Sequence, residues 1–124
     1  MTDYRLSGPA EAKIKEILAE SEREFGTQAR ERYAALMIRA IEDIAENHDR
    51  MGVEHHRGLD DRLGTYHLRY SRKRVLNPPG RVKDPRHLLV FRMAEDGIVD
   101  ILGVLHDSML PKRAIRKILS QTGP

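Results

Sequence analysis

Two amphipathic stretches that meet at a Phe-Gly-Thr step constrain the fold of this 124-residue chain more than any other feature. In residues 14–25 apolar side chains recur at helical spacing, after a Ser-Gly-Pro start in which Ser7 is expected to cap the helix. Residues 27–47 carry a wider apolar stripe, as expected when a helix contacts both a sheet and a second helix. Gly26 can end the first helix in the left-handed conformation and Thr27 can cap the second, so we expect an αα-hairpin.

The rest of the chain alternates between strand patterns and breaks. Apolar and polar residues alternate over 66–70, and Glu-Asp-Gly at 95–97 predicts a hairpin turn between two apolar stretches. Polar residues and three glycines fill 48–64, where we expect a loop with at most a turn or two of helix. The expected strands span residues 4–6, 66–70, 88–93 and 98–105, and a last helix has Pro111 in its first turn.

This β-α-α-β-β-β-α order predicts an α+β fold with an antiparallel sheet. The N-terminal αα-hairpin must pack on one face of the sheet, because an amphipathic pair has no other place to bury its apolar stripe. Only the short C-terminal helix remains for the other face, so we expect an exposed sheet face with basic rims that acts as a docking surface. The length fits a single domain, 1–124.

Composition excludes several kinds of protein. The chain has no cysteine, which rules out disulfides and thiolate metal sites. No apolar run approaches the ~18 residues of a membrane-spanning helix. The polar N-terminus lacks the pattern of a signal peptide, so the expected location is the cytoplasm.

Positive charge is concentrated in one stretch. Residues 1–63 hold ten Lys and Arg against fourteen Asp and Glu, whereas residues 64–124 hold twelve against five. The whole surplus lies in residues 69–92, which carry eight basic side chains, one acid and an Asn-Pro-Pro-Gly break. Such asymmetry indicates an acidic partner or a polyanion, and the alternative is a basic loop that is merely solvated.

Several segments resemble a known family in their order and spacing. They are YRLSGPAEAKIKEI, then FGTQARERYAALM, then TYHLRYSRKR followed by PRHLLVFRMAEDGIVDILGVLHDSML. Over nearly its full length the chain resembles the ParE/RelE toxins of type II toxin–antitoxin modules. The strand with a Tyr-His pair and the hairpin that ends in Leu-His-Asp look like the ParE branch.

The resemblance implies a partner and a choice between two targets. ParE-type toxins inhibit DNA gyrase and are not nucleases, whereas RelE-type toxins enter the ribosomal A site and cut mRNA. Both are silenced by an antitoxin whose extended C-terminal segment wraps the toxin. We therefore expect a cognate antitoxin that is acidic and partly disordered alone, a hetero-oligomer with it, and no membrane partner.

The two targets require different chemistry. Cleavage of RNA at its 2′-OH needs a base, an acid and a cation for the phosphorane charge. His106 ends the last predicted strand, where a general acid or base could sit, but no Tyr follows it. Gly103 and Val104 stand where related chains often carry Arg. The simpler interpretation is a histidine bonded to the backbone, and His67 and His87, which alternate with apolar neighbours, are interpreted as structural or surface residues.

No metal or cofactor is expected. The nearest approach to a metal site is His55 and His56 with Glu54 and Asp60. Adjacent side chains in a loop seldom converge without a third fixed ligand, and the chain has no spaced zinc pattern.

The sequence therefore predicts a ParE-like toxin that binds DNA gyrase, acts by surface contact and is neutralised by an antitoxin. One alternative is a ribosome-dependent mRNA endonuclease that uses His106 with Arg92 or Arg69. Two others are an inactive toxin-fold binding protein, which Gly103 keeps open, and a small basic domain that binds something else. The predicted partner-binding residues, of which those on strands are expected to line a groove, are Arg69, Tyr70, Arg72, Lys73, Arg74, Arg81, Lys83, Arg86, Leu88, Val90, Arg92 and Ile101.

Overall fold

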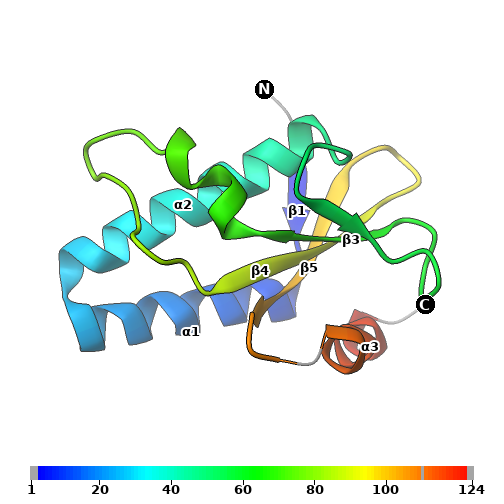
Figure 1. Cartoon of the computed structure of the whole chain (residues 1–124). Coiled ribbons are helices and arrows are strands. Elements are labelled where there is room, and N and C mark those ends of the chain that lie inside the picture. Colours follow the sequence, from blue (N-terminus) through cyan, green and yellow to red (C-terminus); the bar gives the residue numbers. More distant parts are fainter. Residues whose placement is uncertain (1–2, 110, 123–124) are drawn as a thin grey trace.

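The computed structural model describes residues 3–109 and 111–122 and confirms the α+β fold (Figure 1). Five strands form one sheet in the order β1-β5-β4-β3-β2. β1 runs parallel to β5 and the other neighbours are antiparallel, so the sheet is mixed and not purely antiparallel. The elements are β1 (Tyr4–Leu6), α1 (Gly8–Phe25), α2 (Thr27–Glu46), β2 (Val53–His55), β3 (Leu63–His67), the 3₁₀ helix η1 (Leu68–Arg74), β4 (His87–Met93), β5 (Val99–His106) and α3 (Pro111–Thr122).

The corner between the first two helices follows the predicted pattern, with one exception. Ser7 caps α1, because its Oγ accepts a hydrogen bond from the Ala10 backbone N–H at 3.1 Å. Gly26 ends α1 with φ at +94°, and its N–H donates to the Glu22 carbonyl at 2.9 Å. The prediction that Thr27 caps α2 is wrong, since Gly26 occupies the cap position and no side chain caps this helix.

The strand predicted for residues 66–70 is wrong beyond His67, where η1 begins. The His67 side chain caps this helix by accepting from the Arg69 N–H at 3.1 Å. Leu68 and Ser71, three residues apart, share one face of the 3₁₀ helix and are both fully buried. The Tyr66 hydroxyl also lies 2.8 Å from the Ser71 Oγ. After His67, buried side chains therefore recur every three residues and not every two residues as expected for a strand.

The predicted loop at 48–64 contains a strand that sequence patterning did not reveal. β2 pairs with β3 in antiparallel register, so that Val53 lies opposite Tyr66 and His55 opposite Gly64. With only three residues, of which one is apolar, β2 has no periodicity of its own and depends on pairing with its neighbour.

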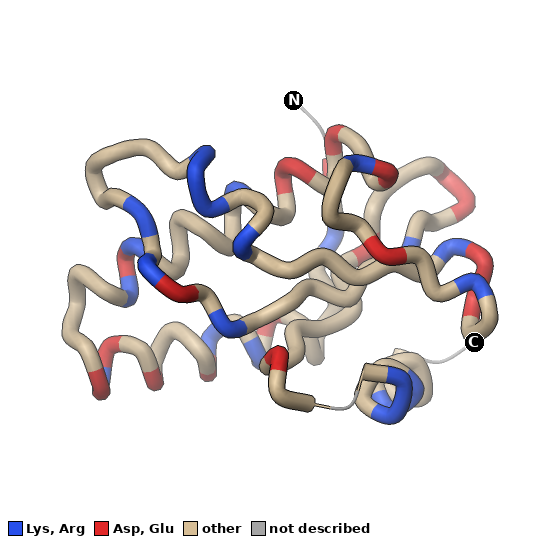
Figure 2. Tube along the Cα trace, viewed as in Figure 1, with Lys and Arg blue, Asp and Glu red and all other residues tan. Residues whose placement is uncertain are grey.

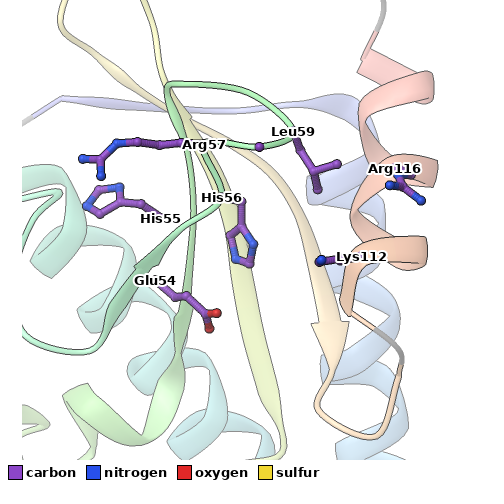
Figure 3. A pocket seen from close by; sticks show the side chains of 8 residues that line it. Glu54, His55, His56, Arg57, Leu59, Lys112 and Arg116 are labelled. Atoms are coloured by element: carbon purple, nitrogen blue, oxygen red, sulfur yellow. The ribbon is translucent and has the colours of Figure 1, made fainter.

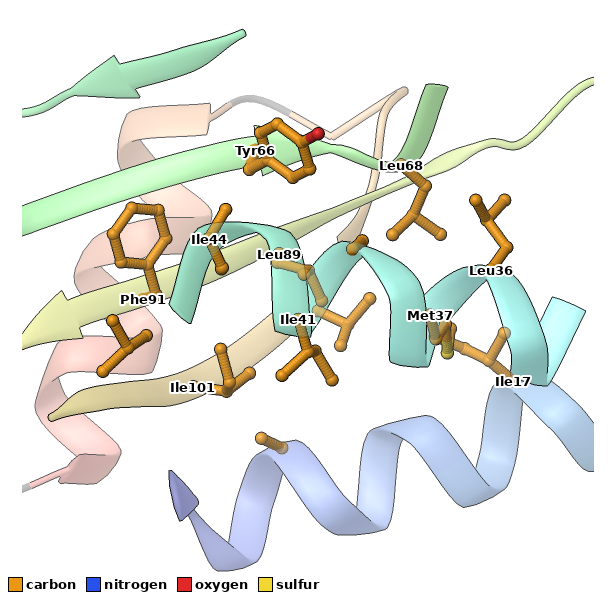
Figure 4. Packing of buried hydrophobic residues seen from close by; sticks show 14 residues of the cluster. Ile17, Leu36, Met37, Ile41, Ile44, Tyr66, Leu68, Leu89, Phe91 and Ile101 are labelled. Atoms are coloured by element: carbon orange, nitrogen blue, oxygen red, sulfur yellow. The ribbon is translucent and has the colours of Figure 1, made fainter. Parts of the chain in front are cut away.

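Two cores lie on opposite faces of the sheet. The larger contains Met37, Ile41 and other residues of α1 and α2 together with Tyr66, Phe91 and Ile101 of the strands (Figure 4). The smaller joins the buried side of α3 to Leu63, Val90, Leu102 and Leu105. The expectation of an open second face is therefore wrong where α3 covers it. No helix in residues 3–109 and 111–122 is long and apolar enough to cross a membrane.

Candidate partner-binding site

The N-terminal part of the basic stretch lies on η1, so Arg69 and Tyr70 are not strand residues as predicted. The Arg69 guanidinium stacks over the Tyr70 ring, 5.0 Å from its centroid, and donates to its hydroxyl at 3.3 Å. The Tyr70 ring in turn covers Gly52, where an added Cβ would meet ring carbon at 2.5 Å. Arg69 and Tyr70 thus pack beside the start of β2.

A buried carboxylate on α2 gathers several of the arginines. Asp43 is 1% exposed, accepts hydrogen bonds from Arg74 at 3.0 Å and from Arg39 at 3.1 Å, and forms an ion pair with Arg50 at 3.1 Å. The Ser71 hydroxyl donates to the same carboxylate at 2.6 Å. Asp43 therefore fixes η1 to α2. It also neutralises Arg74, one of the cations that the sequence suggested for binding a partner.

Arg72 and Arg81, in the same basic stretch, contact backbone carbonyls of the chain itself. Arg72 donates to the Val82 carbonyl at 2.6 Å, and Arg81 donates to the Lys73 carbonyl at 3.4 Å. These contacts hold η1 against the loop that leads into β4. Figure 2 shows the basic positions of this stretch along η1 and the loop that runs down to the start of β4, with an acidic position among those of the loop.

Three predicted groove residues lie on different faces of the sheet. Val90 is fully buried in the smaller core, and Leu88 packs against that core. Ile101 is fully buried in the larger core, beside the helical hairpin. The structure corrects the expectation that these residues line one accessible groove, because α3 and the hairpin cover them.

A groove of about 670 Å³ lies elsewhere, between the helical hairpin and the segment before β4. One wall, on α1, carries Glu20 and Glu24, and the opposite wall carries Lys83 and Arg86. Phe25, 73% exposed, stands at the end of α1 and lines the groove. We call this site the α1–α2 groove; its lining is Ile17, Glu20, Ser21, Glu24, Phe25, Ala29, Arg32, Tyr33, Val82, Lys83, Asp84, Arg86, His87 and His106.

Three titratable rings meet in this groove. The Tyr33 hydroxyl lies 2.5 Å from Nδ1 of His87, and the His87 and His106 rings are perpendicular with centroids 5.3 Å apart. Burial, with a smaller repulsion from His106 and Lys13, lowers the pKa of His87 to about 4, and burial raises the pKa of Tyr33 to about 12. At neutral pH both groups are uncharged, so the phenol O–H donates to the imidazole nitrogen.

Asp107 connects this cluster to β3. Its Oδ2 lies 3.0 Å from Nε2 of His67, and its Oδ1 pairs with Arg86 at 3.0 Å. The hydrogen bond from His67, followed by that from Arg86, lowers the pKa of the Asp107 carboxyl below its ordinary value. His67, interpreted from sequence as structural or surface, holds the end of β5 against the end of β3.

The catalytic set considered from sequence is not brought together. His106 pairs with His87 at the start of β4, and its Nδ1 lies 2.7 Å from the Ser108 hydroxyl. Arg92 lies five residues further along β4, which is about 16 Å at ~3.3 Å per residue. Arg92 forms an ion pair with Asp60, with 3.6 Å between Nη1 and Oδ2, and Arg69 donates to the Tyr70 hydroxyl.

The histidines of the predicted loop make separate contacts. His55 lies 2.8 Å from the Asp49 carboxylate, and Nε2 of His56 lies 2.8 Å from the Thr65 hydroxyl. Within residues 3–109 and 111–122 no group of three or more His, Cys, Asp and Glu is placed to hold a metal ion.

Sequence reasoning missed the roles of Tyr33 and His87. In the sequence Tyr33 falls within the apolar stripe of residues 27–47, and nothing local marks its hydroxyl as a partner for a strand. Counting back from the hairpin turn places His87 opposite residue 105. The irregularity at Leu102 shifts the pairing by one residue and brings His106 opposite His87 instead.

The fold is that of a small α+β protein with a mixed five-stranded sheet. The family model described as ParE toxin of type II toxin-antitoxin system, parDE, matches residues 4–111. The chain therefore belongs to the ParE toxin family of type II toxin–antitoxin systems. Comparison with curated proteins gives no match. Membership of this family implies an antitoxin partner.

Proposed function

We propose that this protein inhibits DNA gyrase by binding to it, and that its antitoxin neutralises it by placing a segment in the α1–α2 groove. The match to the ParE family over residues 4–111 is the observation that carries the proposal. The ParE branch, to which the His-Asp end of β5 also points, acts on gyrase. The α1–α2 groove is our candidate site for the antitoxin.

The α1–α2 groove has the features of a site for an amphipathic peptide segment. Its centre is apolar, and the exposed Phe25 offers an aromatic surface of the kind that anchors protein interfaces. Glu20 and Glu24 face a basic wall, so a segment with charges of opposite sign on its two sides would be held in one orientation.

Inhibition by contact also agrees with how the basic stretch is used. Arg72, Arg74 and Arg86 each contact an oxygen of the chain itself, in the Val82 carbonyl and in two carboxylates. These arginines shape the surface beside the groove and are not gathered around one point where a phosphorane could form.

The target is tested by separating the two activities in vitro. Purified toxin is added to gyrase with relaxed plasmid and ATP, and in parallel to a translating extract in which mRNA integrity is followed. We expect supercoiling to stop at toxin concentrations that leave transcripts intact. Cleaved transcripts with normal supercoiling would overturn the gyrase proposal.

The antitoxin site is tested with one exposed side chain. Phe25→Asp places a charge at the rim of the groove, and Ile38→Asp, a change at an exposed position of α2 outside the groove, is the matched control. Loss of a phenyl ring that the bound segment would cover, together with addition of a charge, should weaken binding of the antitoxin from the neighbouring reading frame by at least about tenfold. Equal binding by both variants in calorimetry would place the antitoxin elsewhere.

A second candidate function is the ribosome-dependent mRNA endonuclease. The observation that favours it is the pair of imidazoles, His87 and His106, in a groove that Lys83 and Arg86 also line. An acid, a base and cations for a phosphate are then within one site, although not the set expected from sequence. Loss of transcript cleavage in His106→Ala, with the thermal unfolding midpoint unchanged, would support this function.

A further inference from the structure

Helix α3 presents a purely basic exposed side. It contains four basic residues and no acid, and Lys112, Arg113, Arg116 and Lys117 are all exposed, opposite the buried side of the helix. Figure 2 shows these basic positions on α3 with no acidic segment among them. Within residues 3–109 and 111–122 none of the four forms an ion pair.

The position of these charges opposes the electrostatics of the helix itself. The N-terminal end of a helix carries a partial positive charge and favours acids, and the C-terminal end favours bases. The first turn of α3 instead contains Lys112 and Arg113 without an acid, and its last turn has no basic residue. Basic residues in the first turn of a helix are unfavourable unless a nearby acid balances them, and such unfavourable local choices are typical of functional positions. A bound anion would supply the missing negative charge.

A pocket lies directly beside this side of α3. It has a volume of about 350 Å³ and is formed between α3 and residues 54–59 (Figure 3). Lys112 and Arg116 line it from the helix, and the His56 ring lies in it from the strand side, held by Thr65 at 2.8 Å. Glu54 is the one carboxylate in the lining.

The exposed side of α3 lacks the features of a protein interface. Protein partners are held by buried aromatic or aliphatic anchors, whereas nucleic-acid interfaces are polar and strongly positive. The exposed positions of α3 hold proline, four basic residues, Ser120 and Gln121, with no large apolar side chain. There is also no aromatic ring on α3 to stack on unpaired bases, which favours a duplex over a single strand.

We propose that this side of α3, with its pocket, binds the phosphate backbone of duplex DNA. Residues four apart on a helix lie about 6 Å apart along its axis, so the four cations form two short parallel rows. The arginine forks can each hold a phosphate through two hydrogen bonds, and the lysines add point charges. Contacts of this kind are independent of base sequence.

The test is fluorescence anisotropy with a labelled 20-base-pair duplex at several salt concentrations. The variant replaces Lys112, Arg113, Arg116 and Lys117 with Gln, and the matched control makes the same four changes of charge at Lys13, Lys15, Arg23 and Arg30. If each cation neutralises one phosphate, the logarithm of the association constant of the wild type falls with the logarithm of salt with a slope near −3.6, which is about −0.9 per phosphate. We expect the α3 variant to bind at least about tenfold more weakly at low salt with a slope near zero, and the control to keep the wild-type slope.

Three results would overturn the proposal. They are no binding of the duplex by the wild type at about 50 mM salt, equal losses in both variants, and tighter binding of a labelled poly-glutamate peptide than of the duplex, which would indicate an acidic protein partner. Circular dichroism spectra of both variants serve to check that they are folded. Neither gyrase nor antitoxin is present in this assay. A failure to bind the duplex would therefore not contradict inhibition of gyrase, and a failure to inhibit supercoiling would not contradict binding of the duplex by α3.

Discussion

At the scale of single residues, Asp43 changes how the basic stretch is understood. A count of charges treats each arginine as available to a partner. The fold instead directs Arg74 of η1, with Arg39 and Arg50, to one carboxylate that water does not reach. Removing one member of such a buried group leaves the others without compensation, which costs more than the intact group contributes.

We expect Asp43→Ala to lower the free energy of unfolding by about 2–4 kcal/mol, because the Ser71 hydroxyl and three guanidinium groups lose their acceptor. The matched control is Glu42→Ala on the next position of α2, where the contact to Arg39 is a surface pair at 3.9 Å. That change should cost under about 1 kcal/mol. Urea denaturation measures both values, and equal losses would show that Asp43 is not the organising residue.

The protonation of His87 predicts a dependence of stability on pH. Its pKa is lowered from 6.5 to about 4 in the fold, by burial first and then by His106 and Lys13, partly offset by Asp107. Between these pH values the unfolded chain binds a proton that the folded chain does not. The stabilisation is therefore complete above pH 6.5 and is lost as the pH falls toward about 4.

His87→Asn should flatten this acid limb, because the amide does not titrate and its oxygen can still accept from Tyr33. His48→Asn, at an exposed histidine beside Asp49, is the control and should leave the limb unchanged. Urea midpoints compared from about pH 7 down to about pH 4 give the slope. An identical acid limb in His87→Asn and the wild type would contradict the assignment.

At the scale of elements, Gly103 decides how α3 meets the sheet. An added Cβ at this position of β5 would lie 2.7 Å from Cδ1 and 3.2 Å from Cγ1 of Ile118. The family resemblance indicates that related chains often carry Arg at the position of Gly103. Here the helix occupies the space that such a side chain would need, so the glycine has a packing reason.

Gly103→Val should destabilise the protein by about 1–3 kcal/mol, since valine suits a strand but overlaps Ile118. Gly58→Val is the matched control, because a Cβ there meets nothing within 4 Å. Combining Gly103→Val with Ile118→Ala should restore part of the loss. Thermal unfolding of the wild type, the single variants Gly103→Val and Ile118→Ala and the double variant gives the coupling energy, and additive losses would mean that the two residues do not interact.

At the scale of the molecule, patterning predicted what depends on long periodic segments and missed what depends on pairing. The stripes of α1 and α2, the Ser7 cap and the turn at 95–97 are local, and each was found. Five alternating residues at 66–70 could not distinguish a strand from a 3₁₀ helix, because the buried contact between Ser71 and Asp43 is distant in sequence. β2 likewise exists only through its neighbour.

The candidate site was less predictable than the fold for the same reason. The α1–α2 groove combines Phe25 and Tyr33 of the hairpin with His87 and His106 of two strands. The hairpin residues are distant in sequence from the two histidines, so no short segment of the sequence reveals the site. Charge counting found the stretch 69–92 but not which of its cations the chain uses itself. Charge counting also did not reveal the basic side of α3, because residues 93–124 contain four basic and four acidic residues and have no net charge.

The arrangement of two cores around one sheet predicts how the molecule responds to loss of α3. Ile115→Ala removes the centre of the smaller core, which holds Val90 and Leu102 against the helix, and should cost about 2–5 kcal/mol. Hydrogen exchange should rise most in α3 and at the end of β5, while α1 and α2 stay protected, because their contacts lie on the opposite face. Leu119→Ala, at a partly buried position of the same helix, is the control and should cost less. Uniform loss of protection in both cores would show instead that the sheet transmits the defect and that the two faces unfold as one unit.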